Sequence, residues 1–503
     1  MALTIEEIKK FIADDKGSER KRRAAVGDRY YNAEHDILKY RLFYYNADGN
    51  LVEDKTRSNI KIVHPFYTEL CDQLSGYMLS FEENPIRAKE KVEGLQDFLD
   101  QYFDDEFWAE VEEQLTGTTA KGFDYIFAYK NEDNKTVFQY ADGMNVVEVS
   151  ARDADDKKDH VIYWVTDTIE KGKKTVTRIQ DVDDTQVYYY IQIGDSGKIE
   201  LDPDEPINPR PHVVYTENGP EGKSSDSFGF IPFWRLDYNK KQISALKPIK
   251  GLIDDYDLHA CSLSNNLKDF DTPLHVVSGF NGDNLEELQT NLKTKKIVGV
   301  DAEGDVQVRT VDVPYQARKE KLDIDEKNIY RFGMGLNTSG LKDTNATTNI
   351  AIKTAYALLD MKANKLEKRL KKMLKQIIKV VLDEINKQNK KDYQLSDIYF
   401  EFTRSVMTNE TENIQNEKTE AETQQIKINT ILNIAANVGD DQTLRAICDV
   451  MDWDFDEIKK AVDQMTEDPN AEKAKAILEG VVVNDPIEPE PKQKETDPVP
   501  PVE

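Results

Sequence analysis

A polar, glycine-punctuated loop followed by an unusually long helical pattern constrains this chain more than any other stretch. Residues 333–349 read GMGLNTSGLKDTNATTN, and residues 350–388 keep apolar side chains three and four positions apart. Glycine, asparagine and aspartate accept turn conformations, so the first segment predicts a mobile connection. An oxygen of Thr347, Thr348 or Asn349 can cap the helix that follows.

The helix predicted at residues 350–388 would be roughly 55–60 Å long at about 1.5 Å per residue. Its broad apolar face predicts burial among neighbouring elements rather than a place on the surface. It also carries a basic row, namely Lys362, Lys365, Lys368, Arg369, Lys371, Lys372, Lys375 and Lys379. We expect this row to be solvated or to face a partner, and acidic neighbours in the same protein could neutralise it. A DNA-binding groove is the alternative.

Composition limits the classes of function. The chain has 503 residues and a net charge of −28, which argues against a protein that coats DNA, although DNA could still slide past it. Cys71, Cys261 and Cys448 are far apart in sequence and predict reduced, buried thiols in a cytoplasmic setting. The amino-terminal residues predict a short amphipathic helix rather than a signal peptide. No apolar run is long enough to predict a membrane span.

The spacing of apolar residues changes within the first half of the chain. Residues 1–120 predict mainly helices, with an amphipathic pair at residues 95–115 that breaks near Asp104. From residue 123 to residue 215 the apolar residues alternate, which predicts an antiparallel meander. Its strands are expected at residues 125–129, 146–149, 160–165, 175–179 and 187–193.

The second half predicts a stalk with a tip. A helix at residues 243–270, with Pro248 in its first turn or at a kink, is followed by a small α/β insert. The insert has strands at residues 274–277, 296–300 and 306–311 and a helix at residues 284–292. Further helices are expected at residues 314–332, 410–438, 441–451 and 454–465, with a strand at residues 397–403. The sequence from residue 484 is an acidic, proline-rich tail.

Motifs for catalysis are weak. Residues 172–175 (GKKT) lack the upstream glycine of a phosphate-binding loop and predict a turn between strands. Residues 333–335 (GMG) predict a helix end, and the six histidines have no metal-binding spacing. The acidic clusters at residues 153–156 and 181–184 predict solvated turns, with a weak divalent-ion site as the alternative. We therefore expect no enzyme and no cofactor.

Five short stretches are more informative together than alone. They are residues 208–212 (NPRPH), 231–233 (IPF), 252–257 (LIDDYD), 355–364 (AYALLDMKAN) and 402–404 (FTR). In their order and spacing, over about residues 25–480, the chain resembles the portal proteins of long-tailed bacteriophages (the siphophage type) from Gram-positive hosts.

The resemblance implies an α+β, mainly helical portal fold and a homo-oligomeric ring, usually of twelve subunits, at one capsid vertex. Viral double-stranded DNA would be packaged and later ejected through the ring without sequence-specific contacts. The implied partners are the terminase large subunit, a head-completion adaptor, and the scaffolding and major capsid proteins. The implied location is the virion, after assembly in the host cytoplasm. A separate ATPase would have to power packaging.

The resemblance also implies a division of the chain. The regions are an α/β wing (residues 1–240), two stem helices (241–270 and 314–332), a clip (271–313), a tunnel loop (333–349), a long wing helix (350–389), a helical crown (390–483) and a disordered tail (484–503).

Two sets of site residues follow from this division. The residues expected to touch DNA are Asn337, Thr338, Ser339, Lys342, Asp343, Thr344 and Asn345. From the residues alone, Lys342 could equally be one exposed loop charge. The residues expected to meet the motor or the adaptor are Asn281, Asp283, Glu286, Glu287, Lys293 and Lys295.

Two other functions compete with this interpretation. The chain could be another virion structural or adaptor protein of the head–tail junction, although an adaptor would not need a loop followed by so long a helix. It could also be a metal-dependent nuclease or another hydrolase that uses the aspartate clusters.

Overall fold

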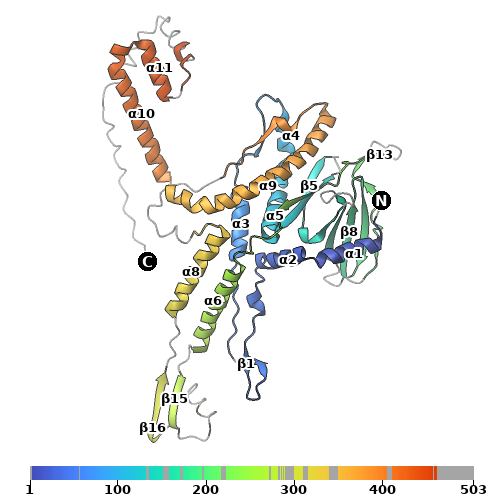
Figure 1. Ribbon diagram of the computed structural model, residues 1–503, viewed down its shortest axis with the longest axis vertical. Helices are drawn as coiled ribbons and strands as arrows, with labels where there is room; N and C mark the ends of the chain where they lie inside the picture. The colour runs from blue at the N-terminus through green and yellow to red at the C-terminus, as the bar shows by residue number, and fades with distance from the viewer. Residues whose placement is uncertain are drawn as a thin grey trace, which may run out of the picture. The chain divides into compact units, whose positions relative to one another are not determined.

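The computed structural model shows a mixed α+β chain that is mainly helical (Figure 1). It forms two compact units, Met1–Met407 and Thr408–Glu503, each of which is described by itself. The structure describes residues 3–460 apart from residues 56, 132–134, 151–157, 170–173, 195–196, 217–222, 271–273, 281–283, 285, 287, 289–299, 310–314, 339–348, 405–409, 452 and 457.

Helices dominate the first 121 residues, as predicted. The long ones are α1 (Ile5–Lys16), α2 (Glu19–Tyr31), α3 (Phe66–Met78), α4 (Leu95–Tyr102) and α5 (Asp105–Lys121). The predicted break near Asp104 is confirmed, because the Asp104 side chain caps α5 by accepting a hydrogen bond from the Phe107 amide. Between α2 and α3 lie a single 3-10 turn, η1 (Asp36–Lys39), and a hairpin of β1 (Phe43–Tyr45) and β2 (Leu51–Glu53).

The predicted meander is two sheets rather than one. An antiparallel meander runs through β6 (Val146–Ser150), β7 (Lys158–Ile169), β8 (Lys174–Val182), β9 (Gln186–Ile193) and β10 (Ile199–Leu201), and β11 (Arg210–Pro211) also pairs with β9. A separate sheet has the order β14 (Phe233–Asp237), β4 (Phe123–Lys130) and β5 (Thr136–Ala141). Its register places Phe233 opposite Phe127, and their rings stack with centroids 5.0 Å apart. Two further short pairs join β12 (Val213–Thr216) to β13 (Lys223–Asp226) and β3 (Ile86–Ala88) to β17 (Ile398–Phe400).

The prediction of a solvated acidic turn at residues 181–184 is wrong for two of its members. Asp181 lies inside β8, is fully buried, and is 2.7 Å from Nδ1 of His160 on β7. Asp183 is also buried and accepts hydrogen bonds from the amides of Thr185 and Gln186. Both carboxylates therefore accept hydrogen bonds from groups of the protein itself. The cluster at residues 153–156 lies outside the described residues.

The predicted stalk is present with two corrections. Its helices are α6 (Lys250–Phe270) and α8 (Tyr315–Gly333), and they pack against each other. Helix α6 begins after Pro248 rather than around it; proline has no amide hydrogen, and the residues before Lys250 form turns. Between these helices, β15 (Leu274–Phe280) pairs with β16 (Val300–Arg309). The strand predicted at residues 306–311 belongs to β16, which already begins at Val300, and its pairing with β15 has a register shift between Ser278 and Phe280. Residues 296–299 of the other predicted strand lie outside the described residues. Most of the helix predicted at residues 284–292 lies outside the described residues.

The long helix α9 (Asn349–Asn389) is the centre of the largest core. Its apolar face is buried as predicted, against α3, α4, α5 and β14 (Figure 1). The second unit contains α10 (Glu410–Val438), with the predicted bounds, and α11 (Asp440–Met451). All three cysteines are buried free thiols, as predicted. In the described part of the chain, no helix combines the length and the apolar character that crossing a bilayer requires.

Candidate functional site: the root of the polar loop

The first part of the polar loop is held firmly, which corrects the prediction of a mobile segment from its first residue. The side-chain amide of Gln73, on α3, donates to the Leu336 carbonyl at 2.9 Å and accepts from the Leu336 amide at 3.0 Å. Leu336 itself is buried in the core of α9. Because one side chain pairs both backbone groups of Leu336, the loop starts from a fixed point.

Two glycines let this root lie directly on α3. A Cβ atom on Gly333 would come within 2.7 Å of Leu70, and one on Gly335 within 2.0 Å of Leu70. Both distances are below normal contact, so a larger residue at either position would require the Leu70 side chain or the root to move. The sequence pattern GMG is thus a helix end, as predicted, and its glycines serve close packing.

A buried lysine fastens the root to α9. Lys362 is only 5% exposed, and its Nζ donates to the Gly333 carbonyl at 2.9 Å. The lysine thereby places a cation at the carboxyl end of α8, where the helix dipole favours it. Burial lowers the pKa of Lys362, and the nearby Cys71 opposes that shift. Lys362 therefore does not belong to the exposed basic row that the sequence predicted.

The acidic stretch LIDDYD, on α6, binds the neighbouring elements through its three carboxylates. Asp254 accepts from the Tyr30 hydroxyl and from Lys250, and Asp255 is paired with Lys321 of α8. The hydrogen bond from Lys321 lowers the pKa of Asp255. These contacts tie α6 to α2 and α8.

The third carboxylate, Asp257, is the most enclosed. It is fully buried, 2.7 Å from Nδ1 of His35 and 2.8 Å from Nδ1 of His64, and it accepts from the His64 amide at 3.0 Å. Burial raises the pKa of Asp257, but the hydrogen bonds from the two histidines outweigh it and hold the pKa below its usual value. This cluster joins α6 to both ends of the segment between α2 and α3.

A polar cluster holds the amino-terminal half of α9 to the chain that leaves it. Arg404 donates to Asn364 at 2.9 Å and to Asp360 at 3.2 Å, and it is paired with Glu367. Asp360 also accepts from the Tyr77 hydroxyl of α3 at 2.6 Å. The stretches AYALLDMKAN and FTR are therefore contact partners, which explains why the two belong together in the sequence.

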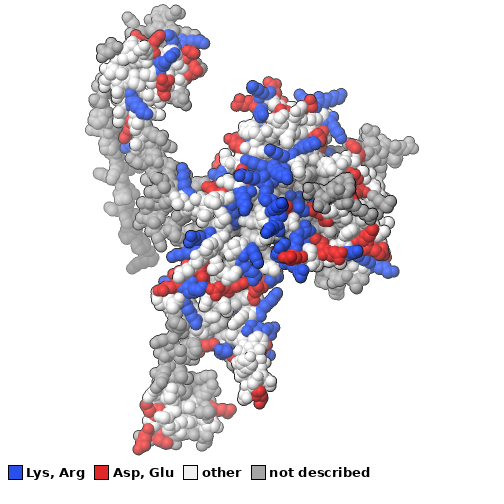
Figure 2. Space-filling model, in the orientation of Figure 1, with Lys and Arg blue, Asp and Glu red and all other residues white. Residues whose placement is uncertain are grey.

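The exposed face of α9 is basic (Figure 2). Among the described residues, Lys371 pairs with Glu367 at 2.6 Å, whereas five other lysines of this row make no ion pair with a described carboxylate. These five are Lys365, Lys368, Lys372, Lys375 and Lys379. Within the described residues, an acidic neighbour thus neutralises this row only at Lys371.

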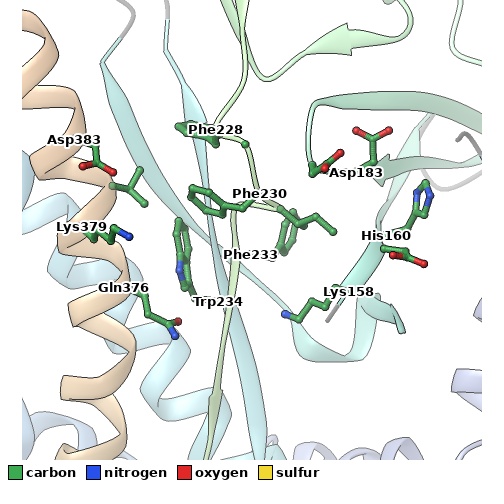
Figure 3. Close-up of a pocket in the computed structure, with 15 residues that line it drawn as sticks. Lys158, His160, Asp183, Phe228, Phe230, Phe233, Trp234, Gln376, Lys379 and Asp383 are labelled. Carbon is green, nitrogen blue, oxygen red and sulfur yellow. The ribbon is translucent and has the colours of Figure 1, made fainter. Parts of the chain in front are cut away.

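A groove of about 1010 Å³ runs between α9 and the two sheets (Figure 3). Lys379 and Asp383 of α9 line one side, and Lys158 and Asp183 line the other. The aromatic residues of the segment that leads into β14 lie between them, namely Phe228, Phe230, Phe233 and Trp234. Because both signs of charge face the groove, it does not select an anionic or a cationic ligand.

Three of the predicted site residues are described. Asn337 is half-buried and donates to Glu326 of α8 at 3.3 Å, so it belongs to the root of the loop. Thr338 is exposed next to it, and Glu286 is exposed between β15 and β16. The other predicted site residues lie outside the described residues, namely Ser339, Lys342, Asp343, Thr344, Asn345, Asn281, Asp283, Glu287, Lys293 and Lys295.

Sequence reasoning missed the residues that hold the root. Leu70 was visible as one member of the apolar face of α3, but nothing in the sequence pairs it with glycines more than 260 positions away. Gln73 gives no local signal either, since a glutamine on a helix is usually solvated.

Comparisons with known proteins agree with these features. The family described as "Phage portal protein, SPP1 Gp6-like" matches residues 10–472. The portal protein of Bacillus phage SPP1 is 25% identical over 396 residues, which cover 77% of this chain and 75% of the relative. The portal protein of Clostridium phage phiCD119 is 24% identical over 432 residues, which cover 82% of this chain and 88% of the relative.

Proposed function

Because the chain belongs to the SPP1 Gp6-like family of phage portal proteins, we propose that it forms a ring at one capsid vertex, through which viral DNA is packaged and ejected. Family membership confirms the resemblance seen in the sequence and makes the chain a structural component of the virion that serves DNA packaging. The ring, its twelve subunits, its channel and its partners belong to the proposal.

The parts of the chain take definite roles in this proposal. Residues 1–240 form the wing, α6 and α8 form the stem, and the region between them forms the clip. Helix α9 crosses the wing, and residues 390–483 form the crown. Residues up to Arg404 still contact the first unit, through β17 and the Arg404 cluster, so the compact part of the crown starts at Thr408.

The observation that carries the proposal is the anchored root of the loop. Gln73, Lys362 and the two packed glycines fix residues 333–337 between α3, α8 and α9. A loop that contacts moving DNA needs a rigid base to transmit force to the ring. The stretch beyond this base, from Thr338 to Asn345, is proposed to reach DNA in the channel.

The proposed contact with DNA is weak by composition. Each phosphate that a lysine neutralises raises the affinity for DNA and makes that affinity more dependent on salt concentration. Between residues 337 and 345 the sequence offers Lys342 beside Asp343, with neutral Asn, Thr and Ser around them. Such a loop suits passage without sequence specificity.

The proposal also includes the partners of the clip. The terminase large subunit would dock there during packaging and supply the ATP hydrolysis, and the head-completion adaptor would take its place afterwards. Scaffolding and major capsid proteins would meet the wing. Within the described residues, no group of three or more His, Cys, Asp or Glu side chains could hold a metal ion, so nothing there favours the hydrolase alternative.

The first test is electron microscopy of the purified protein together with its mass from light scattering, alone and with the scaffolding protein. We expect rings with a central hole and a mass near twelve subunits. A chain that stays monomeric under both conditions would contradict the ring.

The second test deletes residues 338–344. We expect the deleted protein to form rings of normal mass, because the root stays in place, but to package little DNA in a phage complementation assay. Normal packaging by the deleted protein would contradict the loop assignment while leaving the ring intact.

A further inference from the structure

A separate surface lies beside the stem helices. Residues 38–62, here called the stem arm, leave the end of η1, form the β1–β2 hairpin and return to α3 (Figure 1). The arm projects in the same direction as α6 and α8. None of the roles proposed above uses it.

One edge of the arm is fixed to α6 by a polar ladder. The amide of Ser58 donates to Asp269, that of Ile60 donates to Asn265, and that of Ile62 donates to the Cys261 sulfur. The ladder follows α6 towards its carboxyl end, and the cluster around Asp257 closes it at the other end. The arm therefore has a defined position along the stem.

The hairpin at the tip of the arm is apolar and exposed. Its large apolar side chains have exposed fractions from 38% for Val52 to 73% for Tyr45. The residues concerned are Tyr40, Phe43, Tyr44, Tyr45, Leu51 and Val52. A two-stranded hairpin is at best marginally stable alone in water, and a cluster of exposed aromatic residues marks an interaction surface.

We propose that the stem arm clasps the stem of the neighbouring copy of this chain in the ring. The inference rests on the ring proposed above and adds the surface that holds neighbouring subunits together. A ring of identical subunits needs two different faces that fit each other. The arm supplies one face at the level of the stem, where the next stem in a closed ring must lie.

The stem also exposes single apolar side chains for such a contact. Leu267 of α6 is 52% exposed, and Ile324 of α8 is 54% exposed. Charge also favours a copy of this chain as the partner. Residues 38–62 carry five Lys or Arg against three Asp or Glu, a net of +2, whereas the whole chain carries −28.

The test compares two double variants that remove the same groups. Tyr44→Ser with Tyr45→Ser alters the tip of the arm, and Tyr129→Ser with Tyr399→Ser removes two exposed tyrosines from β4 and β17. Ring formation is measured by light scattering and sedimentation over a range of protein concentrations. Circular dichroism and the unfolding midpoint check that both variants fold.

The arm variant is expected to need at least a tenfold higher concentration than wild type to form rings, whereas the control assembles normally. Hydrogen exchange provides a second readout in the unaltered protein. The amides of residues 43–53 are expected to exchange more slowly in the wild-type ring than in the unassembled arm variant.

Rings of the arm variant with wild-type concentration dependence, or free exchange of these amides in the wild-type ring, would overturn the inference while the portal function stands. Normal rings that no longer bind the terminase or the adaptor would also overturn it, since the arm would then serve another protein. A wild-type chain that never forms rings, even with scaffolding protein, would overturn both this inference and the proposed function.

Discussion

Asp257 shows how single buried groups hold the stem in place. Its carboxylate has two histidines and one backbone amide as partners, and none of it reaches solvent. The three partners come from the two ends of the segment that carries the stem arm. One side chain therefore sets where this segment leaves and rejoins the stem.

Replacing Asp257 with Asn is expected to lower the free energy of unfolding by about 3–5 kcal/mol, because the buried His35 and the partly exposed His64 lose their shared charged acceptor. The measurement is urea denaturation followed by circular dichroism. Asp255→Asn is the matched control, since Asp255 lies two positions earlier with its side chain 41% exposed. The Asp255→Asn variant should lower the free energy of unfolding by about 1 kcal/mol or less. Equal effects of the two variants would contradict the role of the buried cluster.

The pair of His160 and Asp181 predicts a dependence on pH. Burial lowers the pKa of His160, but the hydrogen bond and the charge of Asp181 outweigh it and raise the pKa above its usual value. The stability that this pair contributes is then complete below about pH 6.5, the pKa of a free histidine, and is lost as pH rises through the higher folded-state pKa.

The wild-type unfolding midpoint should therefore fall as the pH is raised from about 6 to about 9. In His160→Gln, part of this slope should disappear, because the side chain can no longer titrate. The measurement is thermal unfolding at several pH values. An unchanged slope in the variant would show that other groups cause the pH dependence.

At the scale of elements, periodicity predicted the helices well and the partners of the strands poorly. The sequence predicted α9 and the bounds of α10, because apolar residues three and four positions apart define one face of a helix. The split into two sheets was not readable. The split depends on the pairing of β14 with β4 across more than 100 residues. Contacts between side chains such as Phe127 and Phe233 stabilise this pairing.

The candidate site shows the same limit. The composition of the loop predicted a non-helical segment after α8, which residues 334–338 confirm, but it did not predict the anchored root. The anchors, Leu70 and Gln73, lie on a helix far away in sequence, and they act through packing and amide geometry. Tertiary contacts of this kind leave no local pattern in a single sequence.

The packing of the root gives a prediction at this scale. Gly335→Ala places a Cβ atom 2.0 Å from the end of the buried Leu70 side chain, so Leu70, the root or α3 must shift, and we expect a loss of about 1–3 kcal/mol of unfolding free energy. Gly251→Ala in α6 is the control, because its Cβ meets open space. There, alanine should be neutral or stabilising by up to about 1 kcal/mol. The free energy of unfolding of both variants is measured by chemical denaturation. An unchanged value for Gly335→Ala would contradict close packing of the root.

At the scale of the whole molecule, the boundary near residue 407 predicts how the chain tolerates truncation. The four apolar cores formed by the described residues lie before this boundary. A chain that ends at Met407 should keep the unfolding midpoint of the first unit. A chain that ends at Ser396 loses β17 and Arg404, which contact β3 and α9, and its midpoint should fall. Equal midpoints for the two truncations would contradict the role of this last segment.

The exposed lysines of α9 lead to a prediction about how the assembled ring binds DNA. The five exposed lysines of α9 could form a DNA groove, or they could face solvent and protein partners. Each phosphate contact steepens the salt dependence of binding, by close to one unit of slope. We expect α9 to stay off the DNA path, because the loop root is joined to the stem helix α8 by the hydrogen bond from Asn337 to Glu326.

The triple variant Lys365→Gln, Lys372→Gln and Lys379→Gln alters one stripe of α9, because these positions are seven residues apart. It should leave the salt slope of double-stranded DNA binding by the ring unchanged. Lys342→Gln, in the loop, should make the slope shallower by about one for each subunit that touches DNA. Fluorescence anisotropy at increasing KCl measures both. A slope that falls by about three per contacting subunit in the triple variant would instead place α9 on the DNA path, and the loop would then share its role with the long helix.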